Sequence, residues 1–155
     1  MKFFITATDT DIGKTFVTTS LLKAFLNANF NAIALKPVQT GCDTIAEKAV
    51  APDLSEYQKI NPKNDFPPRY AFKFPASPHF SANLENERIN LGELEIYVNK
   101  YAKNAEVTLI EGAGGVFVPL NEDEIFLDFI QILQVPIVLV CKNVLGSINH
   151  TLLNI

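Results

Sequence analysis

Four short apolar runs, separated by longer amphipathic segments, constrain the fold of this 155-residue chain more than any other feature. The runs are Lys2–Thr6, Asn31–Leu35, Val107–Ile110 and Pro136–Cys141, and their length and apolar character favour buried strands. Strands that alternate with helices imply right-handed crossovers and a parallel sheet with helices on both faces. The sequence therefore predicts a single α/β domain over residues 1–155, because 48% hydrophobic residues suit one compact core.

The segments between these runs carry helical patterns. In Thr15–Asn27, the apolar residues Val17, Leu21 and Phe25 recur every four positions and form a stripe along one side of a helix. Further helices are expected at Asp53–Ile60, Leu91–Ala102, Ile125–Leu133 and from Ser147 to Leu153. Residues 61–78 contain Pro62, Pro67, Pro68, Pro75 and Pro78, so we expect mostly loop there.

Charge and composition restrict the partners of the protein. Thirteen basic and seventeen acidic residues give a net charge of −4, and no basic block stands out. Nucleic acid and anionic membranes are therefore not expected partners. The apolar runs are too short to span a bilayer and polar residues interrupt the apolar start MKFFITAT, so we expect a cytoplasmic protein. Cys42 and Cys141 lack a metal-binding spacing and are expected to be reduced thiols.

Polar and glycine-rich segments follow each predicted strand. They are Ala7–Thr15, Lys36–Gly41, Glu111–Gly115 and Asn143–Asn149. Ligands of open parallel sheets bind at the carboxyl ends of the strands. The four segments therefore predict one binding site at that edge of the sheet.

The segment ATDTDIGKT, residues 7–15, ends like a phosphate-binding loop. In such a loop, N–H groups at a helix start surround the phosphate, the lysine reaches the β- and γ-phosphates, and the next hydroxyl binds Mg²⁺. Gly13, Lys14 and Thr15 supply these groups between a predicted strand and a predicted helix. Ala7 stands where the first glycine is usual, and five residues separate it from Gly13. The context favours a nucleotide site; an ordinary turn with an exposed lysine is the alternative.

Carboxylates and a second lysine follow the other predicted strands or begin a helix. Glu111 closes the buried run VTLI, where a carboxylate favours a Mg²⁺ ligand over a solvated strand end. Asp53 is a weaker candidate because Pro52-Asp53-Leu54-Ser55 also fits a helix cap. Lys36 is expected at the same edge as Lys14, and two ammonium groups in one cleft predict an anion between them. A surface lysine in a turn is the alternative role of Lys36.

Five motifs occur in an order that a known enzyme family shares. That family has a phosphate loop of the form G-T-D-T-x-x-G-K-T, which residues 7–15 match except at Ala7. Its motifs K-P-V-x-[ST]-G and E-G-A-G-G correspond to Lys36–Gly41 and Glu111–Gly115. Ser77-Pro78-His79 matches a serine-proline-histidine segment, and Leu145–His150 matches L-G-x-I-N-H. Over its whole length the chain resembles dethiobiotin synthetase, the ATP-dependent ring-closing enzyme of biotin synthesis.

The resemblance implies a role for each matched residue. ATP would be held by Asp11, Ile12, Gly13, Lys14, Thr15, Phe16, Asp53, Glu111, Gly112, Ala113 and Gly114. Mg²⁺ would be held by Thr15, Asp53 and Glu111. Lys36 would lie beside the carbamate and the γ-phosphate, with Lys14 and Thr10 as further catalytic residues. Thr10 and Thr40 would contact the substrate, 7,8-diaminopelargonate, and Asn149 would receive its distant carboxylate across a homodimer interface.

The implied reaction is an ATP- and Mg²⁺-dependent carboxylation followed by ring closure. CO₂ adds to one amine, and the carbamate oxygen attacks the γ-phosphate. The second amine then opens the mixed anhydride, which gives dethiobiotin, ADP and phosphate. Two lysines and Mg²⁺ suit this transfer because negative charge spreads over the phosphoryl group.

Two departures from the family pattern carry further expectations. The Cβ of Ala7 would crowd the loop if that position needed a positive φ. Family members continue beyond position 155 with purine-contacting residues, so we expect the C-terminal part of the family fold to be missing and ATP, GTP and CTP to be poorly discriminated. The alternatives are a shortened inactive member or a P-loop ATPase that controls partner dimerisation. The second class carries an early loop lysine, and Asp9 and Asp11 argue against it.

Overall fold

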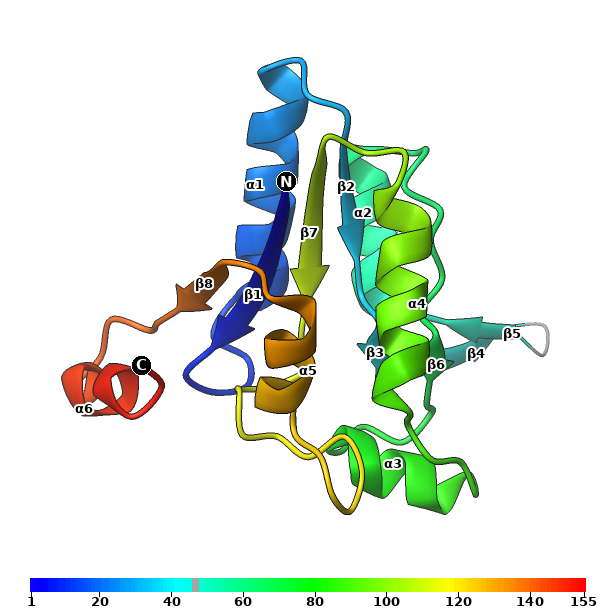
Figure 1. The fold of residues 1–155 in the computed structure, drawn as a ribbon, viewed down its shortest axis with the longest axis vertical. Coiled ribbons are helices and arrows are strands. Elements are labelled where there is room, and N and C mark those ends of the chain that lie inside the picture. Colours follow the sequence, from blue (N-terminus) through cyan, green and yellow to red (C-terminus); the bar gives the residue numbers. More distant parts are fainter. Residues whose placement is uncertain (46–47) are drawn as a thin grey trace.

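A four-stranded parallel sheet lies at the centre of the computed structural model, which describes residues 1–45 and 48–155 (Figure 1). The strand order is β2-β7-β1-β8, with bounds of β2 Ala32–Leu35, β7 Val107–Glu111, β1 Lys2–Ala7 and β8 Ile137–Val140. In β1, Phe4 pairs with Ile110 of β7 on one side and Ile137 of β8 on the other. The predicted parallel α/β fold is confirmed, and the four predicted strands differ from the observed ones by a residue at their ends.

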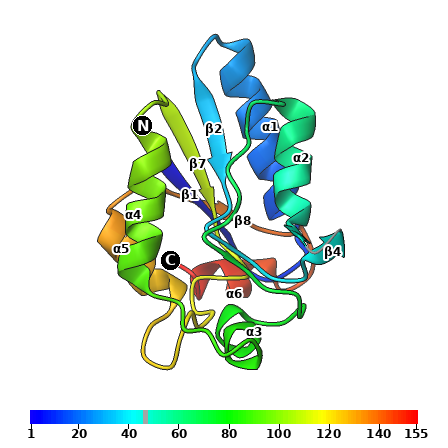
Figure 2. The ribbon, with the colours of Figure 1, turned by 90° about the vertical axis from the view of Figure 1, so that its right-hand side faces the viewer.

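Helices cover both faces of this sheet, as predicted (Figure 2). Helices α1 and α2 lie on one face, and α4 and α5 lie on the other. Their bounds are α1 Lys14–Asn27, α2 Pro52–Ile60, α4 Leu91–Ala102 and α5 Phe126–Leu133. Because successive side chains of a strand point to opposite faces, β1, β2 and β7 each contribute residues to two cores. Phe4 belongs to the core on the α4–α5 side, and Ile5 belongs to the core on the α1–α2 side.

The last helix, α6 (Ser147–Leu152), follows β8 and lies apart from the helices that cover the sheet (Figure 1). None of its residues is buried, and Ile148 and Leu152 are 77% and 63% exposed. The predicted helix is therefore present, with little cover from the rest of the described chain. Among the residues that the structure describes, no helix has the length and apolar character needed to cross a bilayer.

Several short elements were not predicted from the sequence. Two two-residue strands pair in parallel, and two three-residue strands pair antiparallel; they are β3 Val38–Gln39 with β6 Tyr70–Ala71, and β4 Asp43–Ile45 with β5 Lys48–Val50. Such strands are too short to show a periodicity. Helix α3 (Pro78–Leu84) begins at the last proline of the predicted loop, because the first position of a helix needs no N–H group.

The outer edge of β2 is held by a side chain instead of a strand. Asn64 is fully buried, and its Oδ1 accepts a hydrogen bond of 2.8 Å from the backbone N–H of Ala34. Its Nδ2 donates a 2.9 Å bond to the carbonyl oxygen of the same residue. One amide group thus satisfies both backbone groups that Ala34 turns away from the sheet.

Candidate functional site

The carboxyl ends of β1 and β7 and the segment after β2 open into one cavity of about 750 Å³. Such a volume suits a small-molecule site. The predicted site residues that line it are Thr10, Asp11, Gly13, Lys14, Thr15, Lys36, Thr40, Asp53, Glu111, Ala113 and Gly114. Three of the four predicted segments therefore meet. The fourth segment, Asn143–Asn149, does not line this cavity.

The loop between β1 and α1 has the backbone that an anion site requires. Gly13 is the N-cap of α1 and adopts a left-handed conformation with φ 102°, and no side chain caps the helix. The N–H groups of the first turn are therefore free to face the cavity. Asp11 also has a positive φ, 56°, which is uncommon for a residue other than glycine.

Ala7 does not distort this loop. It is the last residue of β1, it is fully buried in the core, and the positive φ angles of the loop fall at Asp11 and Gly13 instead. The condition under which its Cβ would crowd the loop is therefore not met. Close approach matters instead at Gly115, where a Cβ would lie 3.0 Å from the carbonyl oxygen of Ala7.

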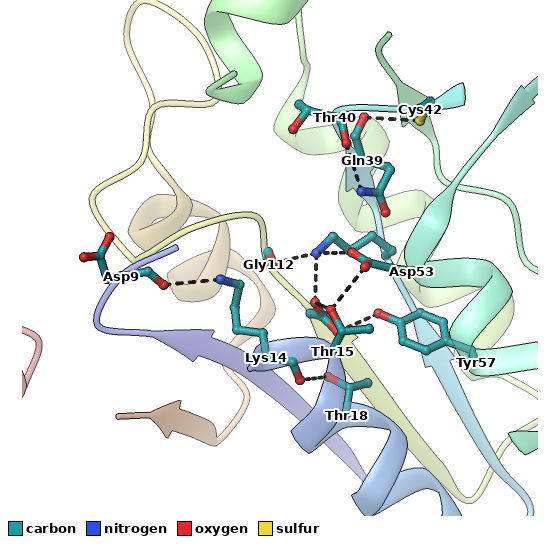
Figure 3. A network of polar contacts seen from close by, with 12 residues as sticks. Asp9, Lys14, Thr15, Thr18, Gln39, Thr40, Cys42, Asp53, Tyr57 and Gly112 are labelled. Carbon is teal, nitrogen blue, oxygen red and sulfur yellow. Dashed lines mark hydrogen bonds and ion pairs between the residues drawn. The ribbon is translucent and has the colours of Figure 1, made fainter. Parts of the chain in front are cut away.

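Thr15, the second residue of α1, meets two carboxylates (Figure 3). Its Oγ1 lies 2.9 Å from Oε1 of Glu111 and 3.1 Å from Oδ1 of Asp53. Glu111 comes from the end of β7 and Asp53 from the first turn of α2. Three elements that are distant in sequence thus bring three hard oxygen ligands together. In the described part of the chain, no cluster of three or more histidine, cysteine or carboxylate side chains forms a metal site by itself.

Lys36 is buried beside the same carboxylates. Its Nζ lies 2.7 Å from Oδ2 of Asp53 and 2.9 Å from Oε1 of Glu111, and it donates a 3.0 Å bond to the carbonyl oxygen of Gly112. Burial alone would lower the pKa of Lys36, but Glu111 and Asp53 outweigh burial and raise this pKa above the usual lysine value. Lys36 is therefore a fixed cation of the site, and the alternative of a surface lysine is wrong.

Lys14 is the less neutralised of the two cations. Within residues 1–45 and 48–155, its Nζ donates one hydrogen bond, a long one of 3.4 Å to the carbonyl oxygen of Asp9. Burial, and then the charge of Lys36, lower the pKa of Lys14 from its usual value. A site with one paired and one weakly paired ammonium group favours an anionic ligand.

Tyr57 is a site residue that the sequence analysis missed. It is fully buried in α2, and its hydroxyl group donates a 2.7 Å bond to Oε2 of Glu111. Burial, and then the charge of Glu111, raise the pKa of Tyr57 well above its ordinary value. The one signal in the sequence is its position four residues after Asp53, which places both on the same side of a helix. Gln39, Ser77 and Val118 also line the cavity without having been predicted as site residues.

Four predicted site residues do not line the cavity: Ile12, Phe16, Gly112 and Asn149. Gly112 still touches the site through its carbonyl oxygen, which accepts from Lys36. The side chain of Phe16 is 75% exposed at the start of α1. Asn149 is exposed on α6, away from the cavity of its own chain.

Comparison with known proteins identifies the family of the chain. A family model described as an AAA domain matches residues 1–155. The chain is 37% identical over 155 residues to the ATP-dependent dethiobiotin synthetase of Anoxybacillus flavithermus, and covers 70% of that protein. It is 39% identical over 157 residues to the synthetase of the same name from Halalkalibacterium halodurans, with 65% of that protein covered. It is 38% identical over 154 residues to the synthetase of the same name from Legionella pneumophila (strain Paris), and covers 71% of that protein.

Each of these alignments includes 98 or 99% of the chain. Each alignment therefore includes the loop with Lys14, the segment with Lys36 and the end of β7 with Glu111. The chain belongs to the ATP-dependent dethiobiotin synthetase family.

Proposed function

We propose that the protein is an ATP-dependent dethiobiotin synthetase of biotin biosynthesis. It carboxylates 7,8-diaminopelargonate with CO₂ and closes the ring to dethiobiotin, with release of ADP and phosphate. The observation that carries the proposal is the meeting of Lys14 and Lys36 with the Thr15, Asp53 and Glu111 oxygens in one cavity. Phosphoryl transfer needs this combination of fixed cations and hard ligands more than it needs covalent chemistry from the protein.

The phosphates of ATP bind at the start of α1. The free N–H groups after Gly13 surround them, and Lys14 opposes the β- and γ-phosphates. The lowered pKa of Lys14 is consistent with this role, because an anion in the cavity relieves the repulsion from Lys36.

The oxygens of Thr15, Asp53 and Glu111 fit Mg²⁺. A hydroxyl group has one hydrogen, yet Oγ1 of Thr15 lies within hydrogen-bond distance of both carboxylates. One of the two contacts therefore joins two oxygens without a hydrogen, which a cation between them would relieve. Mg²⁺ prefers such oxygens and keeps several waters. When bound, it neutralises charge on the β- and γ-phosphates.

The diamine and CO₂ react beside the two lysines. A substrate nitrogen forms a bond to the carbon of CO₂ and loses a proton, which gives a carbamate. A carbamate oxygen attacks the γ-phosphorus, and the bond to the ADP oxygen breaks. The second nitrogen attacks the carbamoyl carbon, loses a proton and displaces phosphate. Lys36 holds the carbamate and the γ-phosphate together, and Thr10 and Thr40 orient the diamine from the cavity wall.

The far carboxylate of the substrate binds Asn149 of a second subunit in a homodimer. Support comes from the exposure of Asn149 and from its absence from the cavity of its own chain. A residue in that place can serve a site only from a neighbouring copy. The cytoplasm remains the predicted location.

Phosphate release tests the proposal. The synthetase needs both the diamine and bicarbonate for rapid release of phosphate from ATP, because the γ-phosphate is transferred to a carbamate. Release is measured with both additions, with each one alone and with neither. Rapid release without the diamine would indicate an ATPase of the partner-controlling kind. No release under any condition would indicate an inactive family member.

A further inference from the structure

Tyr57 is fully buried, and its hydroxyl group contacts Glu111 without lining the cavity. We infer that Tyr57 is a positioning residue, whose hydroxyl group orients the Glu111 carboxylate toward the nucleotide-bound metal. The inference rests on the metal role of Glu111 in the proposed function. Figure 3 shows Tyr57 and Asp53 extending from α2 toward Thr15.

The two oxygens of Glu111 have different partners. Oε1 lies 2.9 Å from both Oγ1 of Thr15 and Nζ of Lys36, and therefore faces the cavity. Oε2 accepts the 2.7 Å hydrogen bond from Tyr57, on the side of α2. The terminal torsion of a glutamate side chain is broad and nearly two-fold, so the other contacts leave its rotation loosely defined. A donor on Oε2 fixes the angle of the carboxylate plane, and thereby the direction in which Oε1 faces the cavity.

Bulk water does not reach this donor. The side chain of Glu111 and the whole of Tyr57 are fully buried. Without the hydroxyl group, Oε2 would be a buried carboxylate oxygen with no partner, which is costly. The carboxylate would then turn Oε2 toward Lys36 or Thr15, and Oε1 would leave its place at the cavity.

The ring of Tyr57 is itself well anchored. It packs in the core on the α1–α2 side together with Ile5, Leu22 and Leu109. Phenylalanine would fill the same volume, so the packing alone does not require a hydroxyl group. Because Tyr57 and Asp53 lie on one helix, α2 supplies one carboxylate of the site and orients the other.

The test compares Tyr57→Phe with the wild-type protein and with Tyr97→Phe. Tyr97 is a buried tyrosine in the opposite core, and its hydroxyl group donates a 3.3 Å bond to the carbonyl oxygen of Phe66. Affinity for a non-hydrolysable ATP analogue is measured by calorimetry, once with excess Mg²⁺ and once in EDTA. In Tyr57→Phe we expect the affinity with Mg²⁺ to fall by about 10- to 100-fold, as for other partners of metal ligands. The affinity in EDTA and both affinities of Tyr97→Phe stay unchanged.

Glu111→Gln separates this inference from the proposed function. We expect Glu111→Gln to weaken the affinity in Mg²⁺ as well, and Tyr57→Phe to add no further loss in that background. If Glu111→Gln lowered the affinity in Mg²⁺ and Tyr57→Phe did not, the positioning role of Tyr57 would be overturned, while the metal role of Glu111 would be retained. A matching loss in EDTA, or in Tyr97→Phe, would also overturn it, because the effect would then be a general one. An unchanged Glu111→Gln would reject the metal role itself.

Discussion

The carboxyl ends of β7 and β8 differ although both follow apolar parallel strands. All five residues of β7 are buried, because the strand lies between β2 and β1. Strand β8 pairs with β1, and its first residue, Ile137, is 47% exposed. The loop after β7 contributes to the cavity, whereas the loop after β8 leads to the exposed helix α6.

This difference shows what a buried charge needs. Glu111 is tolerated at the end of β7 because partners from α1, from α2 and from the segment after β2 surround it: Thr15, Tyr57 and Lys36. Strand β7 offers such neighbours because it has a strand on each side and helices over both faces of the sheet (Figure 2). After β8, by contrast, Lys142 and Asn143 are exposed, and helix α6 buries none of its residues.

The largest expected effect is at the β7 side of the comparison. On the proposed function, Lys14→Ala would remove the cation that opposes the phosphates, and we expect ATP turnover to fall by at least about 100- to 1000-fold. The control is Lys23→Ala, which removes an exposed lysine from the same helix. Steady-state phosphate release with the diamine and bicarbonate measures both. Near-normal turnover of Lys14→Ala would reject the phosphate-loop assignment.

Lys36→Met separates chemistry from nucleotide binding at the same edge. We expect ring closure to fall by at least about 100-fold, while affinity for the ATP analogue with Mg²⁺ changes by less than about threefold. Removing one partner of a buried ion network costs about 3–5 kcal/mol, so denaturant unfolding is measured alongside. Lys2→Met is the control, because Lys2 lies at the opposite end of β1. If Lys36→Met lost affinity for the ATP analogue but kept a normal rate of ring closure at saturating ATP, Lys36 would be a nucleotide-binding residue and not a catalytic one.

The smallest effect is expected on the β8 side. On the proposed function, Asn149→Ala would remove a hydrogen bond to the substrate carboxylate, and we expect KM for the diamine to rise about tenfold with little change for ATP. When this variant is mixed with Lys14→Ala, each hybrid dimer has one site that combines an intact Lys14 from one subunit with an intact Asn149 from the other. With the diamine well below its KM and with free exchange of subunits, half of the dimers are hybrids with one intact site each, so activity recovers to about a quarter of the wild-type value. A mixture no more active than its separate components would contradict the shared site.

The sequence predicts the elements whose patterns lie within a few consecutive residues. The periodicities gave the four strands and their covering helices, and a strand, loop and helix in succession identified the segment with Lys14. Glu111 was predicted because a charge at the end of an apolar run is unusual. The paired strands β3 and β6 have two residues each and carry no pattern. Tyr57 was missed because its hydroxyl group acts on a residue 54 positions away.

The outer edge of the sheet at β2 is closed by a side chain. At β2, Asn64 occupies both backbone groups of Ala34 and is fully buried. A strand from another molecule would have to displace this amide from two hydrogen bonds before it could add to the sheet there. The buried amide thus protects this edge against strand addition and against the fibrous aggregation that strand addition can start. We expect a substitution such as Asn64→Ala to lower the amount of protein that stays in solution before it affects catalysis.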